Sequence, residues 1–183
     1  MSEPNFTARD FRQCLLPSEQ GLPKHAWVAV DDHGNVVSVV AVIPIDSKDP
    51  RRVKECALYT TPSRRRQMLA KDLLRWALDD LAAKEPAATL EWTGIATPTG
   101  YLVAKSLGLS ISDEESAKLG EELDRRLDKN PDDEHLRSLA AFREDCGGRL
   151  PYNPFNQEKA DQDGRQALRD AAQALSLQVI EET

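Results

Sequence analysis

Three consecutive arginines, Arg64, Arg65 and Arg66, lie between an apolar segment that ends near Pro62 and a long amphipathic segment. Where a strand leads into a helix through a tight turn, the first backbone N–H groups of the helix and its dipole form an anion site, and neighbouring arginines strengthen it. A run of arginines is also common at a solvated helix start. The strand-turn-helix context and Pro62 favour a bound anion, and the solvated helix start stays open as the alternative.

Two other side chains have the chemistry to move protons. Glu55 lies on the apolar segment before the arginines and Tyr101 lies further along the chain, and both carry groups that can exchange a proton. Glu55 also fits a strand pattern as an ordinary surface carboxylate, so both interpretations stay open. The histidines and the three cysteines do not show the spacing typical of metal ligands, and we expect no metal.

The bulk properties limit the class of protein. A chain of 183 residues with 40% hydrophobic and 30% charged residues is typical of a soluble globular protein with one domain, with or without an appendage. No window approaches 18 apolar residues, and the N-terminus lacks the pattern of a signal peptide. We therefore expect a cytoplasmic protein that does not enter a membrane.

The charge is unevenly distributed along the chain. Residues 112–183 contain 18 acidic and 10 basic residues, a net charge of −8, whereas residues 1–111 have a net charge of +1. Nucleic-acid binding needs a broad basic face, which this chain lacks, so we expect no nucleic-acid partner. A small anionic ligand fits the local basic clusters better.

The first 111 residues predict a mixed α/β order. Two β-rich runs within 26–45 flank a loop that contains Gly34, which predicts an antiparallel hairpin. Periodicity predicts the other elements: a short helix within 5–17, a strand over 53–61, a helix over 63–84, a strand over 88–96 and a helix over 98–108. Residues 113–129, 132–145 and 160–180 have helical patterns, although the end of the last segment could instead form a strand.

The turn after the third strand resembles that of the GCN5-related N-acetyltransferase (GNAT) superfamily. In that family the strand ends in a V-x-P step, followed by Arg/Gln-x-x-Gly-x-Gly/Ala and a helix with two leucines. Here residues 60–62 are "TTP" and residues 65–70 are "RRQMLA". Arg65 and Ala70 match the two ends of the motif, whereas Met68 occupies the position of its central glycine. The chain is thus similar to a degenerate member of the family, in which part of the motif is lost. Residues 104–109 resemble a second motif of the family, which lies later in the chain, and Ala104 occupies the position of the family's tyrosine.

The resemblance implies a binding site for acetyl-CoA as co-substrate. The turn would bind the pyrophosphate through Arg65, Arg66, Gln67, Met68, Leu69 and Ala70. The preceding strand would pair with the pantetheine arm through Leu58, Tyr59 and Thr60. A bulged strand has free N–H and C=O groups that suit such an amide-rich arm.

The resemblance also implies a reaction, the transfer of an acetyl group to an amine by direct attack in a ternary complex. Glu55 would be the base, and Tyr101 would replace the missing tyrosine as the acid. The acceptor would be a small-molecule or protein amine, and the family's edge-strand pairing allows a homodimer. The alternative is a catalytically weak or inactive protein of the kind that phages encode, which binds a protein partner through residues 112–183.

The expected architecture is therefore an α/β fold with a mixed, twisted sheet flanked by helices. Residues 1–111 would form a GNAT-like core that binds acetyl-CoA. Residues 112–183 would form an acidic helical extension that packs on the core.

Overall fold

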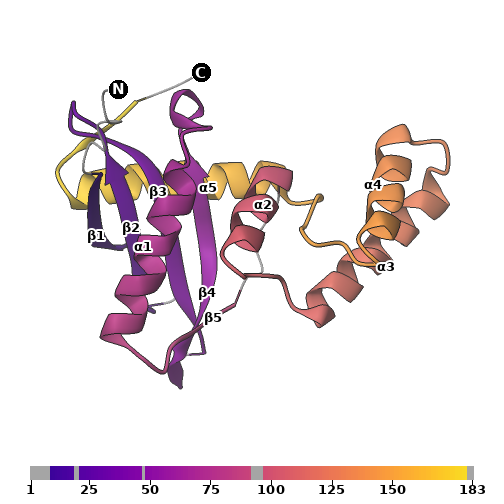
Figure 1. The fold of residues 1–183 in the computed structure, drawn as a ribbon, viewed down its shortest axis with the longest axis horizontal. Helices are drawn as coiled ribbons and strands as arrows, with labels where there is room; N and C mark the ends of the chain where they lie inside the picture. The colour runs from indigo at the N-terminus through magenta and orange to yellow at the C-terminus, as the bar shows by residue number, and fades with distance from the viewer. Residues whose placement is uncertain (1–8, 19–20, 47, 92–96, 181–183) are drawn as a thin grey trace, which may run out of the picture.

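The computed structural model describes residues 9–18, 21–46, 48–91 and 97–180, which form a mixed sheet with helices on both faces (Figure 1). Strands β1 to β4 are antiparallel neighbours in chain order, β5 runs parallel to β4, and β6 runs parallel to the start of β3. The strands are β1 (Asp10–Leu16), β2 (Lys24–Val30), β3 (Asn35–Asp46), β4 (Asp49–Thr60), β5 (Thr89–Glu91) and β6 (Gln178–Val179). The expected fold class, a GNAT-like mixed sheet with flanking helices and further helices at the C-terminal end, is confirmed.

The hairpin predicted within 26–45 is also confirmed, as β2 and β3. Gly34 has a φ of 78°, which a side chain would disfavour. One carboxylate oxygen of Asp31 accepts hydrogen bonds from the backbone N–H groups of His33 and Asn35, both at 2.9 Å. The loop is therefore fixed by its own polar residues, as the sequence indicated.

The helix predicted within 5–17 is wrong, because residues 10–16 form β1. This strand pairs with β2 along its whole length, from Asp10 opposite Val30 to Leu16 opposite Lys24. The apolar residues of such a short segment fit either periodicity. Pairing with a long neighbouring strand decides between them, since it satisfies the backbone groups of the whole segment.

Two other boundaries differ from those expected. β4 begins at Asp49, so the hairpin with β3 includes most of a segment expected to be a loop. Helix α1 (Leu69–Lys84) begins six residues later than expected, and a short 3₁₀ turn, η1 (Pro62–Arg64), precedes it. The arginines thus lie in a turn before the helix. β5 covers the start of the expected strand 88–96, whose residues 92–96 lie outside the described part of the chain.

Two apolar layers hold the sheet between its helices (Figure 1). On one face, α1 and α2 (Pro98–Ser106) pack over sheet residues such as Trp27, Val40 and Val42. On the other face, α5 (Gln157–Ala174) packs through its alanines and Leu168. The C-terminal part of the chain thus covers one whole face of the sheet.

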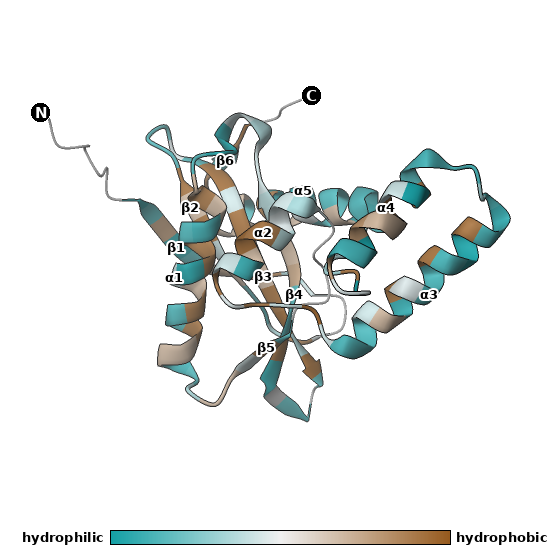
Figure 2. Ribbon diagram, turned by 45° about the vertical axis from the view of Figure 1, so that its right-hand side comes forward, coloured by the Kyte–Doolittle hydropathy of each residue, from teal (hydrophilic) through white to brown (hydrophobic). Residues whose placement is uncertain are grey.

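Helices α3 (Asp113–Lys129) and α4 (Glu134–Asp145) form a hairpin that extends away from the sheet (Figure 1). Both are largely hydrophilic (Figure 2), and their buried leucines pack with Leu150 and Tyr152 of the following segment. After α5, strand β6 pairs with Asn35 and Val36, the part of β3 that lies past the end of β4. The end of the last predicted helix is therefore a strand. None of the described helices is long and apolar enough to cross a membrane.

Candidate functional site

The outer edge of β4 forms the first part of the candidate site. The N–H group of Thr61 donates to the carbonyl of Val37 in β3 at 2.9 Å. Because residues of an antiparallel strand alternate between facing the partner and facing away, the main-chain groups of Leu58 and Thr60 face away from β3. In the described part of the chain, β5 pairs only with the first half of β4. Among the described residues, no strand therefore pairs with the outer edge of the second half of β4, where the Thr60 carbonyl accepts a hydrogen bond from Arg65.

A β-bulge lies in the middle of β4. Val42 pairs with Glu55 and Ala41 pairs with Ala57, which leaves Cys56 as the extra residue. A bulge bends a strand and increases its twist, and bulges are common next to binding sites. Here the bulge lies between the segment that β5 pairs with and the segment whose edge is open.

Tyr59 anchors β4 to α5. A β-carbon on Gly164 of α5 would lie 2.5 Å from the Cβ atom of Tyr59, so only glycine allows this close approach. The guanidinium carbons of Arg65 and Arg165 each lie 5.5 Å from the centroid of the Tyr59 ring, within the range of a cation–π contact. Tyr59 is thus a buried structural residue, in contrast to the outward-facing main chain of its neighbours.

The turn between η1 and α1 forms the second part of the site. Arg66 and Met68 have φ values of 63° and 57°, in the left-handed region that favours glycine. Met68 is the N-cap of α1 without a side-chain hydrogen bond, and its side chain is 61% exposed. Among the described residues, the N–H groups of Leu69 and Ala70 have no hydrogen-bond acceptor, as is general for the first turn of a helix. The start of α1 therefore combines N–H groups that lack an acceptor with the positive end of the helix dipole.

The three arginines differ in their surroundings. Arg64 forms an ion pair with Asp31 at 3.2 Å. The Nε atom of Arg65 donates to the Thr60 carbonyl at 2.9 Å, so this side chain folds back along the outer edge of β4. Arg66 is exposed. Arg64 and Arg65 thus each contact another part of the chain, and Arg66 lies exposed in the turn that precedes the first amides of α1.

Glu55 is buried, with 5% of its surface exposed. Burial raises the pKa of its carboxyl to about 7, and the nearby negative charge of Asp163 in α5 adds to this effect. Its Oε2 atom has no hydrogen-bond partner among the described residues. The interpretation of Glu55 as an ordinary surface carboxylate is therefore wrong, and the group is a carboxyl that can change its protonation state near neutral pH.

Tyr101 lies in α2, partly buried. Its ring stacks with that of Tyr152 at a centroid distance of 6.4 Å, and the Nζ atom of Lys105 lies 5.7 Å from its centroid. Ala104, at the position of the family's tyrosine, is completely buried in the core. Within the described residues, no hydrogen bond joins Tyr101 to Glu55. The structure thus leaves the two predicted catalytic residues without direct contact.

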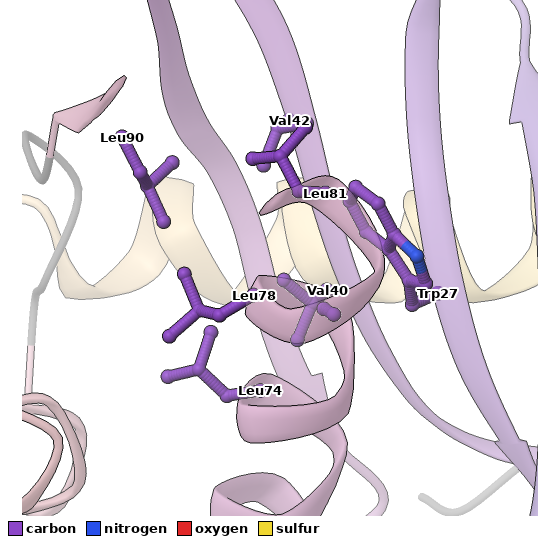
Figure 3. A pocket seen from close by; sticks show the side chains of 8 residues that line it. Trp27, Val40, Val42, Leu74, Leu78, Leu81 and Leu90 are labelled. Atoms are coloured by element: carbon purple, nitrogen blue, oxygen red, sulfur yellow. The ribbon is translucent and has the colours of Figure 1, made fainter. Parts of the chain in front are cut away.

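A small apolar hollow lies between α1 and the sheet, and none of the residues of the β4 edge or of the turn before α1 lines it (Figure 3). Side chains of α1, β2, β3 and β5 line it without any charged group. They are Trp27, Val40, Val42, Leu74, Ala77, Leu78, Leu81 and Leu90. The hollow is a packing feature of the core, since it offers no group for acid–base chemistry or for binding an anion.

Several residues around the site gave no signal in the sequence. Arg9 precedes β1 and bonds to the carbonyl of Gln67 at 2.8 Å and to Asp72 at 3.0 Å. Asp31 and Gly164 contact the site from a hairpin loop and from α5. A glycine within an amphipathic helical pattern was the one available hint, because such glycines often mark a close approach.

Comparison with known proteins gives a consistent result. Three similar solved structures are a GNAT family N-acetyltransferase (YhbS) from Escherichia coli in complex with CoA, a ribosomal-protein-alanine N-acetyltransferase from Brucella melitensis biovar Abortus 2308, and an IAA acetyltransferase from Bacillus cereus ATCC 14579. The first is 28% identical over 44% of this chain and 46% of its own, with a TM-score of 0.38. The second is 17% identical over 58% of this chain and 94% of its own, with a TM-score of 0.46. The third is 16% identical over 54% of this chain and 75% of its own, with a TM-score of 0.41.

The aligned part of the chain spans less than half the length of the E. coli protein. No curated protein matches the chain. The model of the acetyltransferase (GNAT) family, a family that uses acetyl-CoA, matches residues 2–98, which is more than half of the 183 residues. The chain therefore belongs to the acetyltransferase (GNAT) family.

Proposed function

We propose that the protein is an N-acyltransferase that transfers an acetyl group from acetyl-CoA to an amine by direct attack in a ternary complex. The observation that carries this proposal is the open edge of β4, which leads directly to a helix N-terminus with free amides. An extended amide-rich arm pairs with a strand edge, and a pyrophosphate binds at a helix N-terminus. The two features follow one another in the order of the arm and the pyrophosphate in CoA.

The residues around this edge fit the co-substrate. Leu58 and Thr60 offer main-chain groups to the pantetheine arm, whereas Tyr59 contributes only by packing beneath them. Leu69 and Ala70 offer amides to the pyrophosphate, and Arg66 adds a positive charge that faces solvent. Met68 provides the left-handed step into α1, and its exposed side chain lies in solvent.

Arg65 requires a rearrangement in this proposal. Its Nε atom donates to the carbonyl of Thr60, one of the acceptors on the open edge. The pantetheine arm and Arg65 would compete for this oxygen. We therefore assign Arg65 and Gln67 to the turn that surrounds the pyrophosphate, with the guanidinium leaving the β4 edge when the arm binds.

The proposed chemistry needs two proton transfers. The amine nitrogen attacks the thioester carbonyl, and the carbon–sulfur bond breaks. Glu55 accepts a proton from the amine, since a carboxyl with a pKa of about 7 is substantially ionised at neutral pH. Tyr101 donates a proton to the leaving sulfur, with its ring held in place by Tyr152. Acetyl-CoA supplies the activated acetyl group, and the acceptor is a small-molecule or protein amine.

A single charge on the helix N-terminus tests the binding site. In Ala70→Asp a carboxylate enters the first turn of α1, where an acidic side chain stabilises the helix. The new carboxylate would repel two phosphate charges that lie about 5 Å from it by about 1.7 kcal/mol in total, at a dielectric constant of about 80. This repulsion corresponds to roughly fifteen-fold weaker binding of CoA.

The assay is a calorimetric titration of CoA into the wild type, Ala70→Asp and the neutral control Ala70→Asn. We expect binding to the wild type, a loss of at least ten-fold in Ala70→Asp, and a much smaller change in Ala70→Asn. Equal affinity of all three proteins would place the pyrophosphate elsewhere. No binding to the wild type would refute the function.

The second candidate is a weak or inactive relative that engages a protein partner through residues 112–183. The extension of α3 and α4 away from the sheet favours it (Figure 1). Deleting residues 112–183 is not a suitable test, because Ala167 and Leu168 of α5 are buried against the sheet. The better test measures thiol release from acetyl-CoA with a panel of amines. CoA binding without thiol release from any amine would support this candidate over the enzyme.

A further inference from the structure

The turn before α1 holds two left-handed residues without a glycine. Arg66 and Met68 have positive φ values, and L-residues with side chains disfavour this conformation. Strained backbone persists where the surrounding structure fixes it. The question is therefore which contacts hold this turn in the shape that leaves the amides of α1 free.

One set of contacts comes from the hairpin loop between β2 and β3. The Oδ2 atom of Asp31 pairs with the Nη2 atom of Arg64 at 3.2 Å, and the Asp31 side chain is only 8% exposed. The remaining hydrogen bonds of the Asp31 side chain come from His33 and Asn35 in its own loop. The loop is thus a rigid support that holds the start of the turn through one ion pair.

A second set of contacts holds the end of the turn. The guanidinium of Arg9 donates to the Gln67 carbonyl at 2.8 Å and pairs with Asp72 in the first turn of α1 at 3.0 Å. The two left-handed residues lie between the points held by Asp31 and Arg9. The turn is therefore fixed at both ends by charged side chains from other parts of the chain.

We propose that Asp31 is a positioning residue for CoA: through Arg64 it keeps the glycine-free turn in the conformation that presents the amides of α1 to the pyrophosphate. Arg9 has the same role at the other end. This inference rests on the proposed function, because it concerns the affinity of the same site. It also explains how the site tolerates Met68 at the position of a glycine.

The sign of the effect separates positioning from simple electrostatics. Asp31 is an anion near an anion site, so removing its charge by Asp31→Asn would strengthen CoA binding if charge alone mattered. An asparagine oxygen still accepts the hydrogen bonds of the hairpin loop, so the hairpin is preserved. Weaker binding of CoA by Asp31→Asn would therefore come from the loss of the support for the turn.

The test is a double-mutant cycle with Met68→Gly, read by calorimetric titration of CoA. We expect Asp31→Asn to bind CoA about two- to five-fold more weakly, because losing a partly exposed ion pair lowers the population of the competent turn. In the Met68→Gly background only Arg66 remains strained, and Asp31→Asn should have a smaller effect. The matched control is Asp46→Asn at the opposite end of β3, where the carboxylate accepts a hydrogen bond from the Lys48 N–H group of its own loop.

Unchanged or tighter binding by Asp31→Asn would overturn the inference, and so would an equal loss in both backgrounds. Hydrogen exchange gives a readout that is independent of CoA. The N–H groups of Arg65 and Asp72 bond to the carbonyls of Pro62 and Met68. They should exchange faster in Asp31→Asn, and this increase should be smaller when Met68→Gly is also present. If the wild type fails to bind CoA, the proposed function fails, and hydrogen exchange alone still decides whether Asp31 holds the turn.

Discussion

Replacing Met68 by glycine should stabilise the folded protein, which is unusual for a change that removes a side chain. Met68 has a φ of 57° and a side chain that is 61% exposed, so its substitution relieves backbone strain and removes little packing. The left-handed conformation costs an L-residue about 1–2 kcal/mol. Glycine returns about 0.5–1 kcal/mol of this through the larger backbone entropy of its unfolded chain.

The net expectation is a gain of about 0.5–1 kcal/mol in the free energy of unfolding, or a rise of roughly 1–4 °C in Tm for a chain of this size. Urea denaturation of the wild type and Met68→Gly, followed by circular dichroism, measures the difference. Met68→Ala is the matched control, since it removes the thioether but keeps the Cβ atom and hence the strain. A loss of stability in Met68→Gly, or an equal gain in Met68→Ala, would refute the argument that the turn is strained at this residue.

Three further predictions concern a glycine in α5, a glycine in α3 and the buried carboxyl of Glu55. Gly164→Ala should lower the free energy of unfolding by about 1–3 kcal/mol, because the new Cβ atom would lie 2.5 Å from Tyr59 in a packed interface. Urea denaturation measures this loss of stability, and a change of less than about 0.5 kcal/mol would contradict the prediction. Gly120→Ala in α3, where the new Cβ atom would meet only the end of a flexible arginine at 3.6 Å, should stabilise the protein by about 0.5–1 kcal/mol in the same assay. The pKa of Glu55 is raised from 4.5 to about 7 in the folded protein. Between pH 4.5 and pH 7 the folded protein therefore holds a proton on Glu55 that the unfolded chain has lost. The contribution of Glu55 to the free energy of unfolding thus falls as the pH rises through this range. The glutamine side chain of Glu55→Gln cannot ionise, so the stability of this variant relative to the wild type should increase between pH 5 and pH 8. If the difference in the free energy of unfolding between variant and wild type is the same at both pH values, Glu55 titrates normally.

Local signals in the sequence were sufficient where the backbone conformation depends on nearby residues. The loop around Gly34 and Asp31 is held by contacts within a few positions, and it formed the predicted hairpin. The helical patterns of α1 and α3 span several turns, so their apolar stripes were unambiguous. Their start and end points were less certain, as the late start of α1 shows, because boundaries depend on single residues.

The first strand shows where local patterns fail. Residues 10–16 fit a short helix as well as a strand, and the deciding interaction is their pairing with β2. The end of the chain is similar, since β6 forms on the part of β3 that β4 leaves free. Such pairings join residues far apart in the sequence, so no periodicity within the segment could decide them.

The sequence by itself determined the family, the turn after β4 and the residues that could carry the chemistry, because these depend on residue types at short fixed spacings. The tertiary structure decided where those residues lie. It placed Glu55 in a buried position where its pKa rises, packed Tyr59 against α5, and set Arg64 against Asp31 and Arg65 against the Thr60 carbonyl. These roles depend on burial and on charges brought from Arg9, Asp31 and α5, which only the folded chain brings next to the site.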